Sequence, residues 1–159
     1  MFRRILVAYD GSPSAQLALE QAFDLSRAEH VERVTIFSAV PTVSAMIAMA
    51  GGRPDLLQAQ IEAETVERLN AARDGAPADV PVATAWRLGP AGKSIVRAAE
   101  RDDSDLIVMG SRGHGPVGSA LLGSVSTYVM HHADVAVLVA HAPAANSAPA
   151  ENGKAVAVA

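Results

Sequence analysis

The sequence has no cysteine, few aromatic residues, no cluster of basic residues and no long apolar run. Without cysteine, the 159-residue chain forms no disulfide, no thiolate zinc site and no thiol nucleophile. Aromatic residues make up 4% of the chain and hydrophobic residues 50%, so the core must be filled by alanine, valine, leucine and isoleucine. The formal net charge of −4 argues against nucleic acid or an anionic membrane as the main partner.

The apolar segments are too short to cross a bilayer, and they are placed wrongly for a signal peptide. The first of them, at residues 5–8, leaves no room for a charged region followed by a signal-peptide core. We therefore expect a cytoplasmic protein without a membrane partner. The length is enough for one domain with a sizeable core.

Short runs rich in valine, isoleucine and leucine alternate with stretches of helical character. The runs predict strands at residues 3–9, 33–40, 80–87, 105–109 and 135–140. Such alternation is typical of parallel strands that are covered by helices on both faces and joined by right-handed crossovers. We therefore expect an α/β fold with a doubly wound five-stranded parallel sheet in the order 3-2-1-4-5. Its ligand crevice should lie at the carboxyl ends of the strands, where the strand order reverses.

Helix starts are marked by capping residues and by proline. Ser12 is a candidate N-cap, with Pro13 in the first helical position after it. A second helix is expected from about residue 55 to 73, with one apolar face. For the third helix we expect Gly89 as N-cap and Pro90 as the first helical residue.

One domain, at residues 1–141, accounts for all of these elements. Residues 42–53 show no clean hydrophobic period, so we interpret them as a mobile loop or lid. From residue 142 to 159 the composition changes to mainly alanine, with proline, asparagine, serine and glutamate. This composition predicts a disordered tail.

The segment from Met109 to Ser126 is the most informative part of the chain. Gly110 and Gly113 follow a buried strand, and Gly123 precedes a helix expected at residues 125–132, with Ser124 as its N-cap. Glycines at the end of a strand let backbone amides approach an anion, and a helix N-terminus adds donors and a favourable dipole. The segment predicts a nucleotide site, although an ordinary glycine-rich connection would have the same spacing.

These residues together resemble the universal stress protein family, in its ATP-binding branch. The signature of that branch is Gly, two residues, Gly, nine residues, and Gly followed by Ser or Thr. Gly110, Gly113, Gly123 and Ser124 match each position, and Asp10-Gly11-Ser12 and Gly89-Pro90-Ala91 are also family-like. The resemblance covers residues 2–141 and implies a Rossmann-like fold of the adenine nucleotide alpha hydrolase type.

The resemblance implies ATP as the ligand, together with Mg²⁺ or Mn²⁺. Asp10 would contact the nucleoside or phosphate side, and the backbone near Ala39 would read the adenine edge. Residues 109–113 would line the ribose and phosphates, and residues 123–126 would bind the phosphate chain. The nucleotide-binding residues expected on this basis are Asp10, Ala39, Met109, Gly110, Arg112, Gly113, Gly123, Ser124, Val125 and Ser126.

Other interpretations of the polar residues stay open. Asp10 before a glycine can cap its own turn through an Asx-type bond. Arg112 and His114 can offset ligand charge or belong to a solvated loop surface. Residues 87–94 are close to a phosphate-binding P-loop, but Arg87 occupies the place of its first glycine and Pro90 removes an amide.

The function implied by the resemblance is that of an ATP-binding regulatory or stress-response protein. It would form a homodimer through the strand at 135–140 and act on a client that the sequence does not identify. A slow ATPase or adenylyl-transferring enzyme and a nucleotide-free dimeric scaffold are the alternatives. For hydrolysis the sequence offers only Asp10 and His114 as candidate bases.

The interpretation of the tail generates a first prediction. Truncation after Pro143 should leave both the melting temperature and the ATP affinity nearly unchanged, because the removed residues contribute no apolar period to the core. Calorimetry of the full and truncated chains measures this. A fall of several degrees would show that the tail packs on the domain.

Overall fold

The computed structural model describes residues 1–43, 52–113 and 122–141. The expectations for His114, for most of the loop at 42–53 and for the tail after residue 141 lie outside the described residues. None of the helices in these described ranges has the length and apolar character needed to cross a membrane.

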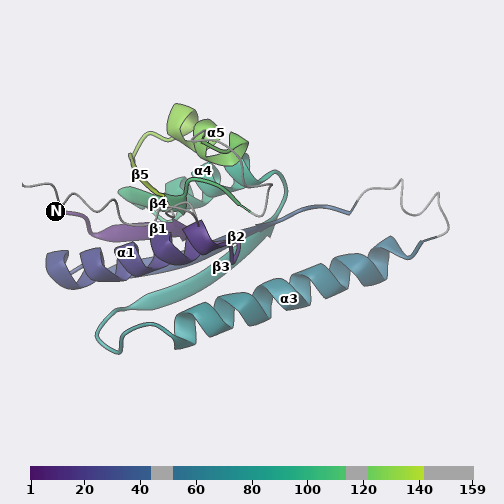
Figure 1. The fold of residues 1–159 in the computed structure, drawn as a ribbon, viewed down its shortest axis with the longest axis horizontal. Coiled ribbons are helices and arrows are strands. Elements are labelled where there is room, and N and C mark those ends of the chain that lie inside the picture. The colour runs from purple at the N-terminus through teal and green to yellow at the C-terminus, as the bar shows by residue number, and fades with distance from the viewer. Residues whose placement is uncertain (44–51, 114–121, 142–159) are drawn as a thin grey trace, which may run out of the picture.

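Five parallel strands form one sheet, in the order β3-β2-β1-β4-β5 (Figure 1). The predicted order and fold class are confirmed, and each strand begins and ends within two residues of its expected bounds. The strands are β1 (Arg4–Ala8), β2 (Arg33–Val40), β3 (Val82–Leu88), β4 (Leu106–Gly110) and β5 (Ala136–Ala140).

In the described part of the chain, two helices cover each face of the sheet (Figure 1). Helices α1 (Pro13–Glu29) and α3 (Pro54–Asp74) lie on one face, and α4 (Ala91–Arg101) and α5 (Ser124–His132) lie on the other. Because side chains alternate along a strand, β1 contributes to both cores. Ile5 and Val7 pack on the α1 side, and Leu6 packs on the α4 side. All three are fully buried, which explains why the central strands have continuous apolar sequences.

Helix α1 begins where the sequence predicts. The Oγ atom of Ser12 accepts a hydrogen bond from the backbone N–H of Ala15 at 3.3 Å, and Pro13 is the first helical residue. Proline fits there because its missing N–H has no partner in the first turn of a helix.

The first residues of α4 and α5 differ from those expected. Gly89 has a φ of +133° and Pro90 is extended, so Pro90 is the N-cap of α4 and Ala91 is its first residue. In α5, Gly123 is the N-cap and Ser124 is already helical, so the predicted Ser124 cap is wrong. The cause is tertiary, because the N–H of Gly123 donates to the carbonyl of Ser111 at 2.8 Å and fixes the turn one residue earlier.

Helix α3 buries only part of its predicted apolar face. Thr65 and Leu69 are buried, whereas the side chain of Leu57 is 37% exposed. The expected stripe is therefore covered by the sheet only in the second half of the helix.

The sheet and α1 approach each other most closely at Gly110, the last residue of β4. A Cβ atom at this position would lie 2.4 Å from Oγ of Ser14 and 2.8 Å from the backbone nitrogen of Ala15. No carbon atom fits at these distances. Glycine is therefore required at position 110 for the first turn of α1 to pack on β4.

This contact predicts a stability difference between two glycine substitutions. Gly110→Ala should lower the free energy of unfolding by about 1–3 kcal/mol, because α1 must move to admit the methyl group. Gly75→Ala is the matched control, since a Cβ there lies at an ordinary 3.5 Å from the nearest atom and φ is −82°. Urea unfolding measures both values. Equal stability of the two variants would contradict the packing argument.

Candidate functional site

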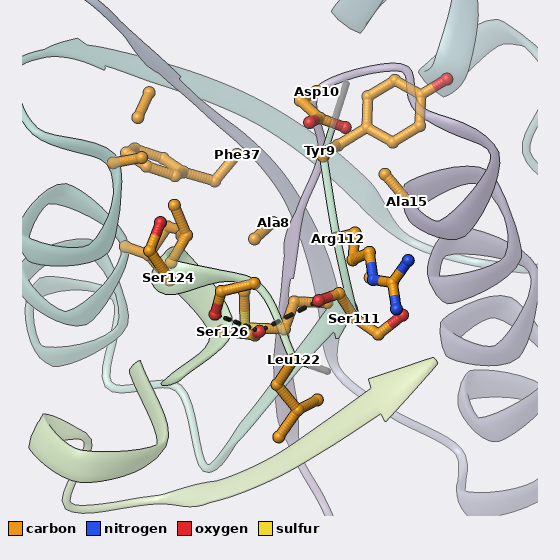
Figure 2. A pocket seen from close by; sticks show the side chains of 18 residues that line it. Ala8, Tyr9, Asp10, Ala15, Phe37, Ser111, Arg112, Leu122, Ser124 and Ser126 are labelled. Carbon is orange, nitrogen blue, oxygen red and sulfur yellow. Dashed lines mark hydrogen bonds between the residues drawn. The ribbon is translucent and has the colours of Figure 1, made fainter. Parts of the chain in front are cut away.

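A cavity of about 540 Å³ opens at the carboxyl ends of the central strands, beside the first turns of α4 and α5 (Figure 2). It lies where β1 pairs with β4 and the strand order reverses, as expected for an open α/β sheet. The ten residues predicted from the sequence all line it: Asp10, Ala39, Met109, Gly110, Arg112, Gly113, Gly123, Ser124, Val125 and Ser126.

One part of the cavity wall is apolar. Phe37 and Ala39 come from β2, Ile95 comes from α4, and Met109 comes from β4. Phe37, Ile95 and Met109 are each less than 5% exposed, so their positions are fixed by packing. The sequence analysis did not identify Phe37 and Ile95. Because Phe37 lies in the second half of β2, towards the end where the cavity opens, its place in the strand could have indicated that it lines the site. The role of Ile95 becomes visible only when α4 is packed on the sheet.

Asp10 uses one carboxylate oxygen to hold its own turn. Oδ1 accepts a hydrogen bond from the backbone N–H of Ser12 at 2.9 Å, so the Asx-type interpretation is confirmed. Gly11 lies between them with a φ of +82°, a conformation that favours glycine. The other oxygen, Oδ2, lies only 2.6 Å from the place that a Cβ on Gly113 would occupy. A glycine at 113 therefore lets the carboxylate approach the backbone that follows β4.

Serine hydroxyls tie the segment after β4 to both neighbouring helices. The carbonyl of Ser111 accepts hydrogen bonds from the N–H of Gly123 at 2.8 Å and from the hydroxyl of Ser126 at 3.1 Å (Figure 2). The carbonyl of Arg112 accepts a hydrogen bond from the hydroxyl of Ser14, on α1. Residues 111 and 112 are thus held between α1 and α5.

The N-terminus of α5 borders the cavity. Helix geometry leaves the first N–H groups, here those of Ser124, Val125 and Ser126, without an acceptor inside the helix. Gly123 has no side chain to cap them, and all four residues line the cavity. These amides and the helix dipole suit an anionic group such as a phosphate.

Tyr9 supplies a neutral polar group at the mouth of the cavity. Its hydroxyl donates to Oε1 of Gln16 at 3.0 Å. Burial raises the pKa of the Tyr9 hydroxyl, the cation of Arg68 opposes this, and the carboxylate of Asp10 adds to it. A raised pKa keeps the phenol protonated at physiological pH.

The protein side chains alone do not form a metal centre in the described ranges. No three histidine, cysteine, aspartate or glutamate side chains of these residues are grouped to hold a metal ion. Among the described residues, Asp10 is the only carboxylate that lines the cavity. A divalent cation there would need further oxygen ligands from a bound phosphate group, which is a common arrangement for Mg²⁺.

Sequence comparison identifies relatives over nearly the whole domain. The family model "Universal stress protein family" matches residues 1–141. A universal stress protein of Mycobacterium tuberculosis is 36% identical over 139 residues, which are 86% of this chain and 44% of that protein. A universal stress protein of Thermus aquaticus is 37% identical over 143 residues and is covered over 98% of its length. The chain thus spans less than half the length of its mycobacterial relative.

Solved structures show the same fold. The structure of hypothetical protein MJ0577 superposes with a TM-score of 0.77 at 24% identity, covering 89% of this chain and 97% of that one. A universal stress protein in complex with cAMP gives a TM-score of 0.57 at 25% identity, covering 88% of this chain and 97% of that one. The universal stress protein from Archaeoglobus fulgidus in complex with dAMP gives a TM-score of 0.56 at 22% identity, covering 87% of this chain and 97% of that one.

The family match covers both the strands and the segments that border the cavity. With the sequence and structural comparisons in agreement, the chain belongs to the universal stress protein family.

Proposed function

We propose that the chain binds an adenine nucleotide in the 540 Å³ cavity, with ATP as its ligand, and that nucleotide occupancy regulates its contact with a client protein. The observation that carries the proposal is the division of the cavity into two parts. An apolar wall at Phe37, Ala39 and Ile95 suits an adenine ring, and the amides at the start of α5 suit phosphates. The cAMP and dAMP complexes of two family members support the nucleotide class.

The proposed orientation places the base between β2 and α4. There the backbone of Ala39 reads the adenine edge, and Met109 and Phe37 contact the ring. The ribose lies beside Asp10, whose Oδ2 faces the cavity next to Gly113. The phosphates then lie along Arg112 and residues 123–126, where Asp10 would supply a carboxylate ligand to Mg²⁺ or Mn²⁺ and the ion would offset the phosphate charge.

The proposed regulation uses the segment after β4. Its carbonyls are bonded to α1 and α5, so a phosphate bound there contacts residues that join both faces of the sheet. A ligand that binds this arrangement stabilises it relative to any opened arrangement. Gly113, the exposed residue of this segment, is then part of the surface that a client protein would sense.

The phosphate assignment is tested at Gly123. A Cβ there would lie 3.2 Å from the carbonyl oxygen of Ser111 and 3.5 Å from Cα of Arg112, so Gly123→Val should push the two segments apart. ATP with magnesium at 100 times its dissociation constant should stabilise the parent by about 2.7 kcal/mol and should not stabilise the variant. Thermal unfolding with and without ATP measures the difference.

The control for this experiment is Gly75→Val, the same substitution at a position outside the cavity where a Cβ makes only ordinary van der Waals contacts. It should keep the full ATP-induced shift. The phosphate assignment is wrong if Gly123→Val, folded by circular dichroism, gains as much stability from ATP as the parent. Ser124→Ala should be milder than Gly123→Val, because its hydroxyl lines the cavity without capping the helix.

We also propose that the chain forms a homodimer through β5. This strand is at the edge of the sheet and carries no charge, so its outer N–H and C=O groups can pair with a second strand. Val137 and Val139 pack against the core beneath α4 and α5, whereas Ala136 is exposed. Position 136 can therefore be changed without disturbing the core.

Ala136→Lys should convert the dimer into monomers. A lysine there places a hydrated charge on the sheet edge that the second strand would cover, and charged side chains on an edge strand, lysine above all, oppose pairing with another strand. Analytical ultracentrifugation measures the mass of both proteins at equal concentration. A dimer that persists in the variant would place the interface elsewhere on the molecule.

A further inference from the structure

A second cavity, of about 360 Å³, lies between α4 and β3. Phe37 lines both this cavity and the 540 Å³ cavity proposed to bind the nucleotide, here called the nucleotide cavity, so the two adjoin at this residue. We call the second cavity the arginine groove, because Arg87 from β3 and Arg97 and Arg101 from α4 line it. None of these arginines was assigned to a site from the sequence. Only Arg87 was considered, in the P-loop interpretation of residues 87–94.

Three arginines line the groove, and its lining in the described residues includes a single carboxylate, that of Asp102. Arg97 and Arg101 are four residues apart on one face of α4, a spacing at which like charges destabilise a helix. In the described part of the chain, none of the three forms a salt bridge, although other arginines do. The arginines in salt bridges are Arg3, Arg4, Arg27, Arg33, Arg53 and Arg73.

Of the residues that the structure describes, Asp102 is the one carboxylate in the groove lining, and it is already neutralised. Asp102 accepts hydrogen bonds from Arg33 and, at 2.7 Å, from the hydroxyl of Thr35. Its charge therefore balances Arg33 rather than the groove arginines. The groove keeps an excess of positive charge on a chain whose formal net charge is −4.

The rest of the groove lining is mostly apolar. Leu6 and Phe37 form part of the wall and are almost fully buried. Ala85 is exposed on β3, and Leu88, at the end of the same strand, is 49% exposed. The groove therefore combines a cationic rim with hydrocarbon surface. Its volume is within the range of small-molecule sites.

We propose that the arginine groove binds a small amphipathic anion, with a phosphate or carboxylate held by Arg87, Arg97 and Arg101 and an apolar part over Ala85 and Leu88. Guanidinium groups suit such oxyanions because their planar N–H donors match two oxygens at once. A cluster of three cations is too small to follow a nucleic acid backbone, whose binding depends on many phosphate contacts. The proposal does not depend on nucleotide binding in the first cavity.

The probe for the experiment is 1-naphthyl phosphate, titrated into the full chain at physiological ionic strength. Calorimetry gives the dissociation constant, and the ¹⁵N Nε resonances of Arg87, Arg97 and Arg101 report binding at the groove itself. Arg87→Gln and Arg97→Gln should each weaken binding about tenfold, the effect of losing one charge-assisted hydrogen bond. Inorganic phosphate should bind at least tenfold more weakly than the probe, because it lacks the apolar part.

The matched control is Lys93→Gln. Lys93 is an exposed cation on α4, one turn before Arg97 and outside the groove lining. The Lys93→Gln substitution should lower the affinity for the probe less than twofold, since salt screens charges that do not touch the ligand. Binding should also survive in the Gly123→Val protein, which separates the groove from the nucleotide cavity.

The proposal is overturned by any of three results. The first is that the three Nε resonances do not respond to the probe. The second is that the two arginine variants lower the affinity for the probe no more than Lys93→Gln does. The third is that inorganic phosphate binds as tightly as the probe. If the parent protein binds the probe at the groove but does not bind ATP, only the nucleotide proposal is contradicted.

Discussion

The pairing of β1 with β4 is the contact on which the rest of this structure depends. It places two strands side by side that are separated by about a hundred residues of sequence, and it reverses the direction in which the sheet grows. The crossovers on either side of this pair go to opposite faces, so a cavity opens between their first turns. Gly110 makes the close approach of α1 possible, because a side chain there would meet Ser14.

Hydrogen bonds from serine then make this opening a defined site. The hydroxyls of Ser14 and Ser126 come from helices on opposite faces, and both donate to carbonyls that follow β4. A buried carbonyl without a donor is costly, so these bonds fix the backbone at residues 111 and 112. The same bonds place the first amides of α5 beside the cavity, where an anionic ligand can accept their hydrogen bonds.

Phe37 and α4 connect the two cavities of the molecule. Phe37 belongs to the apolar wall of the nucleotide cavity and also lines the arginine groove. Ile95 lines the first cavity while its neighbour Ser94 lines the second. Two ligands that share a wall in this way can influence each other's affinity, and such coupling is reciprocal.

The sequence by itself determined the strands, their order and ten of the residues that line the cavity at the carboxyl ends of the strands. These features follow from local patterns, such as apolar runs, the Ser12-Pro13 start and the spaced glycines, together with a family resemblance. Tertiary structure alone decided that Gly123 rather than Ser124 caps α5, and that Gly110 serves the packing of α1. It also decided that Arg87 and Arg97, from different elements, line the same groove. Hydrophobic period and capping preference act over a few residues, whereas these outcomes depend on atoms brought together from separate elements.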